Sequence, residues 1–344
     1  MMLMSKKEAA KIIIFIVIFI FLFTSFSYIM RTNGDTKDRF AGFYAEEKNS
    51  IDVLMIGSST VATSFCSPYM WDRYGFTSYP LSSNSQRPKA IKYVIEEGLH
   101  YQSPELIVIE MRTFIADDNE MAKDEGHIRE TVDNMKYSAR RIRAIDALTE
   151  EFDDKWPFYL DIIKYHSNIG VLTRPSEWKK YDFSLKDEKK GFQIFTNRET
   201  FRLETPDRYT EDRIAIPNNQ EIILRDLLEY LKEKNLNVLF VVSPRATIEG
   251  YDEMMNYCQD IVEEEGFEFL NLNYKYDEMG FDYRYDIEDG AHTNVWGALK
   301  CSDYLGKHIV DNYSIDQEHS DRVKKEWDNS YDLFIKIYNE LDEE

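Results

Sequence analysis

The sequence predicts an α/β protein: a parallel sheet covered by helices on both faces, with one apolar segment near the N-terminus. Three observations lead to this prediction. Short apolar runs that suit buried strands recur along the chain, amphipathic helical patterns lie between them, and a long uncharged stretch precedes both. Strands that alternate with helices form βαβ units, and these units build parallel sheets whose two faces are both covered.

The uncharged stretch runs from Ile12 to Met30. A helix of this length, at about 1.5 Å per residue, nearly spans a hydrocarbon core of about 30 Å. Lys6, Lys7 and Lys11 precede the stretch, whereas the residues after it carry mixed charge. The excess of lysine on the N-terminal side predicts a single-pass protein of the cell membrane, with a cytoplasmic N-terminus and an extracytoplasmic remainder.

A cleaved signal peptide is the alternative interpretation of the same stretch. Ser25-Phe26-Ser27 resembles a small-x-small cleavage site. The apolar run continues past this site, and it is longer than the apolar part of an ordinary signal peptide. The sequence therefore favours an uncleaved anchor, with residues 1–31 as cytoplasmic tail and transmembrane segment.

The soluble part begins with a polar stretch, residues 32–50, which we interpret as a tether. Five strands are predicted after it: Asp52–Ile56, Thr77–Leu81, Leu106–Ile109, Val238–Val242 and Phe267–Leu272. The third and fourth runs are apolar throughout, as in central strands that are buried on both faces. Helical patterns lie between or after the strands: Pro88–His100, Glu221–Lys234, Met254–Glu265 and Val295–Val310.

Residues 115–217 contain no convincing buried strand and are rich in charged and aromatic side chains. A structureless loop of this length would be implausible inside a compact domain. We therefore predict a largely helical cap, inserted after the third strand and beginning with a helix through Ile128 to Ala147. Residues 317–344 predict a charged amphipathic helix, which leaves residues 51–316 for the α/β domain and its cap.

Composition excludes several classes of function. A formal net charge of −21 argues against a nucleic-acid partner, because an acidic surface repels phosphates. Cys66, Cys258 and Cys301 are too few for a disulfide framework and form no zinc-binding pattern. Buried free thiols are the favoured interpretation, and a Cys258–Cys301 bridge is the alternative. No metal site and no organic cofactor is predicted.

Small residues stand where the first predicted strand ends, in Gly57-Ser58-Ser59. Ligands of open α/β sheets bind at the carboxyl ends of strands, and a serine there can begin a helix whose N–H groups attract anions. Serine needs an adjacent base to act as a nucleophile. Taken alone the pattern is weak, because Gly and Ser also end strands that carry no chemistry.

A second pattern, Asp289-Gly290-Ala291-His292, follows the last predicted strand and leads into the helix that begins at Val295. Asp and His three residues apart on such a loop can contact each other. The Asp then fixes the imidazole tautomer, and the His accepts the proton of the serine. The alternative is an Asp that caps the helix beside a surface His.

Together, the two patterns resemble the SGNH/GDSL hydrolase superfamily over about residues 50 to 312. Ile51 to Thr60 resembles its first block, with Ser59 at the nucleophile position, and Asp289 and His292 match its final block. Two further residues fit that final block: Asn294 and Gly297. The resemblance implies a three-layer α/β/α fold with a flavodoxin-like parallel sheet, and a catalytic triad that needs neither metal nor cofactor.

The pattern is most similar to a cell-surface branch of this superfamily, which includes the teichoic-acid D-alanylation protein DltD and the alginate O-acetylation proteins. Members of that branch are anchored or exported and work with a membrane-bound O-acyltransferase. The resemblance implies a serine esterase or O-acyltransferase acting on acyl esters, acetyl above all, of a cell-envelope polysaccharide. The alternative is a non-catalytic assembly or glycan-binding partner of a membrane-bound O-acyltransferase.

The chain departs from the family pattern at three places. Ser58 replaces the Asp of the first block, Ser82 or Ser83 replaces the second-block Gly, and Glu110-Met111-Arg112 stands where the third block has Asn. A serine can still donate its backbone N–H, and other side chains can replace the absent Asn. The candidate donors to the oxyanion are therefore Ser59, Ser82, Ser83, Asn84 and Arg112. For Arg112, a salt bridge to a neighbouring carboxylate is the alternative.

Overall fold

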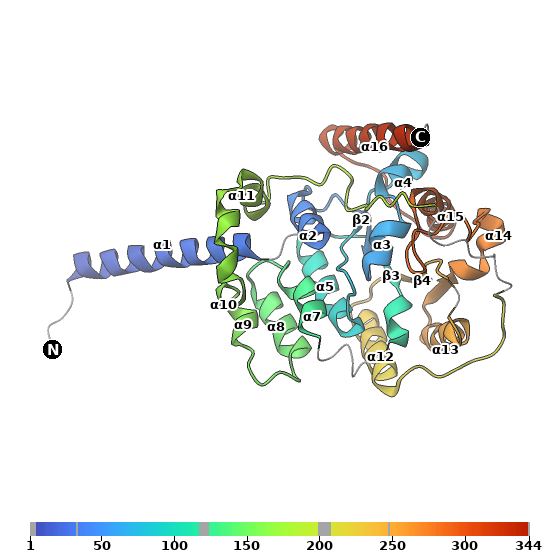
Figure 1. Ribbon diagram of the computed structural model, residues 1–344, viewed down its shortest axis with the longest axis horizontal. Coiled ribbons are helices and arrows are strands. Elements are labelled where there is room, and N and C mark those ends of the chain that lie inside the picture. The colour runs from blue at the N-terminus through green and yellow to red at the C-terminus, as the bar shows by residue number, and fades with distance from the viewer. Residues whose placement is uncertain (1–4, 32–33, 117–123, 199–207, 247, 343–344) are drawn as a thin grey trace.

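A single parallel sheet forms the centre of the protein (Figure 1). The computed structural model describes residues 5–31, 34–116, 124–198, 208–246 and 248–342. Within them, five strands lie in the order β2-β1-β3-β4-β5, and every neighbouring pair is parallel. The strands are β1 (Val53–Ile56), β2 (Ser78–Pro80), β3 (Leu106–Glu110), β4 (Val238–Val242) and β5 (Glu268–Asn271). The prediction of an α/β protein with a parallel sheet is confirmed.

Both faces of the sheet are buried, because alternate residues of each strand pack against a different helical layer. Leu54 and Ile56 of β1 belong to one hydrophobic cluster, and Val53 and Met55 belong to another. The first cluster is completed by α5 (Pro88–Tyr101), α12 (Asn218–Glu233) and α13 (Tyr251–Glu264). The second is completed by α3 (Ser59–Ser64), α4 (Ser67–Tyr74) and α15 (Val295–Asn312). Two short turns follow β5: η3 (Leu272–Tyr274) and α14 (Tyr276–Met279).

The N-terminal helix α1 (Lys6–Met30) projects away from this domain (Figure 1). It is long and apolar enough to cross a membrane, and most of its apolar side chains are exposed. Its last part is different, because Ser25 and Ser27–Met30 are buried in the domain. Arg31 follows directly and is also buried, with its guanidinium paired to Asp161 at 2.7 Å.

The predicted tether is wrong, because part of residues 34–50 forms the buried helix α2 (Asp35–Ala45). Phe40 and Phe43 of this helix are fully buried in the core. The polar residues that suggested a tether are buried too: Lys37 pairs with Glu177 at 3.0 Å, and Arg39 donates to a backbone carbonyl. The described residues on both sides of positions 32–33, at the end of α1 and in α2, are therefore buried in the domain.

The long insertion after β3 is helical in its first part. Its helices are η1 (Arg112–Ile115), α7 (Glu125–Val132), α8 (Ala139–Leu148), α9 (Trp156–Tyr159), α10 (Ile162–Tyr165), η2 (His166–Thr173) and α11 (Pro175–Tyr181). The described residues from Asp182 to Pro217 contain neither helix nor strand, and residues 117–123 and 199–207 lie outside the described residues.

The predicted helix from Ile128 to Ala147 is two helices, α7 and α8. The carbonyls of Asp133 and Met135, between them, accept hydrogen bonds from Arg31, and Ser138 caps the second helix. At the C-terminus, the predicted amphipathic helix is α16 (Asp321–Asp342), which buries Trp327 and Phe334. All three cysteines are buried free thiols.

Candidate active site

The first strand delivers Ser59 to the carboxyl edge of the sheet. β1 ends at Ile56, and Ser59 is the first residue of α3. The turn between them requires glycine, because a Cβ on Gly57 would lie 2.6 Å from a methyl carbon of Val61 and 2.8 Å from the Cβ of Glu110. The side chain of Ser59 thus sits at the start of a helix, where the first backbone N–H groups have no partner within the helix.

Ser59, His292 and Asp289 form one hydrogen-bonded chain, although more than two hundred residues separate the serine from the other two. The Oγ of Ser59 lies 2.8 Å from Nε2 of His292. The Nδ1 of His292 lies 3.0 Å from both carboxylate oxygens of Asp289. Since a carboxylate can only accept, the imidazole carries its proton on Nδ1, and Nε2 is free to accept from the serine.

The loop that carries Asp289 and His292 is held by hydrogen bonds at both ends. The Oδ1 of Asp289 accepts from the N–H groups of Ala291 and His292 at 2.8 and 2.9 Å. Thr293 donates its hydroxyl to the carbonyl of Thr63 in α3 at 2.8 Å, which joins the loop to the helix of Ser59. Asp289 and His292 therefore lie at the two ends of a tight turn, which the Asp289 carboxylate stabilises by accepting from the turn's own N–H groups.

The next residues fix the start of α15 behind this loop. Asn294 caps the helix by accepting from the N–H of Gly297 at 3.1 Å. A Cβ on Gly297 would lie 2.1 Å from the carbonyl oxygen of Asp286, so only glycine fits there. The positions that matched the final family block thus have structural roles that support the loop.

Electrostatics keep His292 neutral and Asp289 ionised. Burial lowers the pKa of His292, and the positive charges of Arg112 and Arg245 lower it further, against the opposing effect of Asp289. Burial alone would raise the pKa of Asp289, but hydrogen bonds from His292 and the Ala291 N–H outweigh it and lower the pKa. A neutral imidazole beside an ionised carboxylate is the state in which His can accept a proton.

Two arginines lie close to the loop of Asp289 and His292, after the ends of β3 and β4. Arg112 donates Nη1 to the carbonyl of Ala291 at 2.9 Å, and no carboxylate lies within ion-pair distance of it among the described residues. Arg245 is only 9% exposed, and its neighbour Ala246 donates to the carbonyl of Gly290 at 3.0 Å. Sequence reasoning missed Arg245, although its place just after a central strand was a usable signal.

Glu110 is the first of the three residues that stand where the SGNH/GDSL pattern would have Asn. It is fully buried at the end of β3, where its carboxylate accepts from the Thr60 hydroxyl at 3.1 Å and the Ser243 N–H at 3.4 Å. Burial raises its pKa. The side chain therefore supports the turn that follows β1, and as an acceptor it cannot replace an amide donor while it is ionised.

The other oxyanion candidates differ in availability. The N–H of Ser83 donates to the side chain of Gln86 at 3.2 Å, and the N–H of Asn84 donates to Thr36 at 3.3 Å. The first group is occupied within its own loop and the second by a side chain of α2. Ser82 is buried, and its carbonyl accepts from Arg39 at 2.9 Å. Among the described residues, the N–H groups of Ser59 and Ser82 and the side chain of Asn84 have no hydrogen bond, and Arg112 donates to the carbonyl of Ala291.

A ring from the insertion covers the catalytic histidine candidate. Phe195 packs edge-on against the imidazole of His292, with ring centroids 5.7 Å apart, and its carbonyl accepts from the N–H of Val295 at 2.8 Å. The side chain of His292 is 19% exposed, whereas that of Asp289 is 48% exposed. The insertion thereby limits the access of water to the imidazole, which the sequence alone did not indicate.

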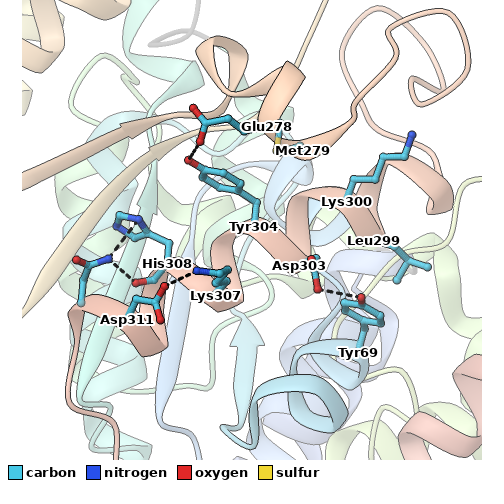
Figure 2. Close-up of a pocket in the computed structure, with 11 residues that line it drawn as sticks. Tyr69, Glu278, Met279, Leu299, Lys300, Asp303, Tyr304, Lys307, His308 and Asp311 are labelled. Carbon is cyan, nitrogen blue, oxygen red and sulfur yellow. Dashed lines mark hydrogen bonds and ion pairs between the residues drawn. The ribbon is translucent and has the colours of Figure 1, made fainter.

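A separate cavity of about 540 Å³ lies on the outer side of α15 and shares no residue with this site (Figure 2). The polar groups around it bond to one another or to neighbours: Tyr69 to Asp303, Tyr304 to Glu278, and Lys307 to Asp311. These satisfied surface groups present no nucleophile with an adjacent base.

No group of His, Cys, Asp and Glu side chains that could hold a metal ion occurs in the part of the chain that the structure describes. Comparison with models of known protein families finds no match, and no curated protein matches the chain.

Proposed function

We propose that this protein is a serine esterase or O-acyltransferase that acts on acyl esters, acetyl above all, of a cell-envelope polysaccharide. The observation that carries the proposal is the hydrogen-bonded chain from the Oγ of Ser59 through His292 to Asp289. An isolated serine hydroxyl is a poor nucleophile, and an adjacent base with its own carboxylate partner activates it.

The proposed reaction has two steps. His292 accepts the proton of Ser59 while Oγ attacks the acyl carbonyl carbon, and the developing oxyanion is stabilised by the N–H groups of Ser59 and Ser82 and by Arg112. The protonated His292, stabilised by Asp289, then gives its proton to the departing alkoxide and leaves an acyl-serine. Water as the second nucleophile makes the protein an esterase, and a sugar hydroxyl makes it an O-acyltransferase.

The SGNH type is the form of this chemistry that the fold supports best. The strand order β2-β1-β3-β4-β5 is the flavodoxin-like order, and the nucleophile candidate follows β1. The Asp and His candidates precede the last helix that covers the sheet, α15. With α1 as a single span and lysines on its N-terminal side, the proposed location of the site is extracytoplasmic.

A non-catalytic role as an assembly or glycan-binding partner of a membrane-bound O-acyltransferase is the second candidate. The observation that favours it is the state of the oxyanion donors. The N–H groups of Ser83 and Asn84 are occupied, and Glu110 stands where the family has a donor. Loss of one donor costs about 10²–10³ in rate, so an incomplete set could leave binding without turnover.

A fluorophosphonate probe separates the two candidates, because it labels only an activated serine. We expect the full chain to be labelled, and Ser59→Ala to abolish labelling. Ser58→Ala is the matched control, since among the described residues the Ser58 hydroxyl bonds only to the neighbouring Thr60, at 2.8 Å. Absence of labelling in the folded wild-type chain, or equal labelling of Ser59→Ala, would leave the non-catalytic role as the better account.

A further inference from the structure

The apolar part of α1 that remains outside the domain is shorter than a bilayer core. The uncharged run ends at Met30, but its last residues are buried against the domain from Ser25 onward. The free part, Ile12 to Thr24, covers only about 20 Å at about 1.5 Å per residue. A hydrocarbon core of about 30 Å exceeds this by about 10 Å, and snorkelling lysines compensate for only part of such a mismatch.

The helices that surround the base of α1 can supply the missing length. We call the segment from Trp156 to Tyr181, which contains α9, α10, η2 and α11, the collar. Figure 1 shows these helices around the domain end of α1. Trp178 of the collar packs edge-on against Phe26 of α1, with ring centroids 6.0 Å apart, and Asn168 donates to the carbonyl of Met30 at 3.0 Å.

The collar carries large apolar side chains that nothing in the described structure covers. The exposed ones are Trp156, Leu160, Ile163, Ile169 and Trp178. Ile169 and Trp156 are 67% and 66% exposed, as much as the side chains of α1 itself. Trp178 touches α1, and α10 and η2, which carry Ile163 and Ile169, also pack against it, so this apolar surface adjoins the proposed membrane span.

The chemistry of the collar suits the boundary between lipid and water. Tryptophan is enriched at that boundary, because its ring is apolar and its N–H is polar. Arg174 and Lys179, on either side of Trp178, are exposed and have no ion pair among the described residues. Positive side chains beside apolar ones bind the phosphates of lipid headgroups while the apolar groups enter the acyl region.

We propose that the collar is a membrane-binding surface, which lies in the headgroup and upper acyl region of the leaflet from which α1 emerges. The proposal rests on the proposed membrane span of α1 and is independent of the proposed esterase activity. It commits to lipid as the occupant, because the shortfall of α1 requires the domain to approach the bilayer on the side that carries these residues.

Spin labels test this proposal in the full chain, reconstituted into vesicles of phosphatidylcholine and phosphatidylglycerol. The native cysteines are fully buried, so a single introduced cysteine takes the label selectively. Ile163→Cys and Ile169→Cys report on the collar, and Ile18→Cys reports on α1. Ile222→Cys, on the exposed face of α12, is the matched control.

We expect the collar labels to be more accessible to oxygen than to a water-soluble nickel chelate, and the Ile222 label to show the reverse. Collar labels with the same accessibility ratio as the Ile222 label would overturn the proposal. If the Ile18 label is in lipid in that case, the proposed membrane span of α1 is retained and only the proposed membrane contact of the collar is refuted. If the Ile18 label is also aqueous, the span fails as well. Collar labels shielded from both reagents would indicate a protein partner and would also overturn the proposal.

Discussion

Replacement of Arg31 by methionine tests how α1 is fixed to the domain. The guanidinium of Arg31 is 1% exposed and donates to Asp161 at 2.9 and 2.7 Å. It also donates to the carbonyls of Asp133 and Met135. Asp161 has a second cationic partner, Arg141, at 2.7 Å. Methionine preserves much of the length of the side chain and removes its charge and its donors.

The expected cost follows from this burial. Arg31→Met leaves Asp161 with one guanidinium in place of two and removes the donor from two buried carbonyls. Breaking a buried pair by the removal of one partner costs about 3–5 kcal/mol. In a domain of about 300 residues, each kcal/mol lowers the melting temperature by about 1.5 °C. We therefore expect a decrease of roughly 4–8 °C.

The assay is thermal unfolding of the full chain in detergent micelles, followed by circular dichroism. Arg213→Met is the control, because the pair of Arg213 with Asp260 is exposed at 44% and 52% and contributes at most about 1 kcal/mol. The double variant Arg31→Met/Asp161→Asn should lose less than the sum of the single variants, since the remaining charge is removed. A decrease for Arg31→Met no larger than that for Arg213→Met would refute this reasoning.

Four further predictions concern the candidate site. Ser59→Ala should lower turnover of p-nitrophenyl acetate by about 10⁴-fold or more. Adding His292→Ala to this variant should lower turnover no further, because triad members act as a unit. A further loss in the double variant would contradict the proposal that His292 acts through Ser59. The pKa of His292 lies below its ordinary value of 6.5, so log kcat/KM should fall only as the pH decreases below that value. Arg112→Gln should raise the pKa at which log kcat/KM falls on the acid side, because it removes a positive charge that opposes protonation of His292. An unchanged pKa would contradict this electrostatic effect of Arg112. Gly297→Ala should lower the urea midpoint by the equivalent of about 1–3 kcal/mol or more, because its Cβ meets the carbonyl of Asp286, and an unchanged midpoint would show that the loop can relax.

The strands could be predicted from the sequence because their apolar residues are contiguous. Val238–Val242 is a strand with the predicted bounds, and Leu106–Ile109 is extended only by Glu110. The convergence of Ser59 with Asp289 and His292 was also predicted, because ends of parallel strands meet at one edge. Their catalytic role stays a prediction until it is measured.

The errors arose where distant partners decide the structure. α2 was interpreted as a tether because Lys37 and Arg39 look like solvent-exposed residues. Their partners, Glu177 and the carbonyl of Ser82, lie far away in the sequence, so nothing local signals that the two cations are buried. The availability of the Asn84 N–H is equally invisible in the sequence, because its acceptor, the Thr36 hydroxyl, lies far away along the chain.

The burial of the end of α1 also bears on proteolytic processing of the chain. Ser25 and Ser27, which resemble a cleavage site, are inaccessible once the domain has folded. A signal peptidase would therefore have to cut before folding is complete, and the competition between the two rates would decide whether a molecule is released or retained. A cut after Ser27 would leave Tyr28 as the new N-terminus, with its charged amino group placed in the core. The cleaved protein would be less stable than the uncleaved chain, so the folded domain favours retention of α1.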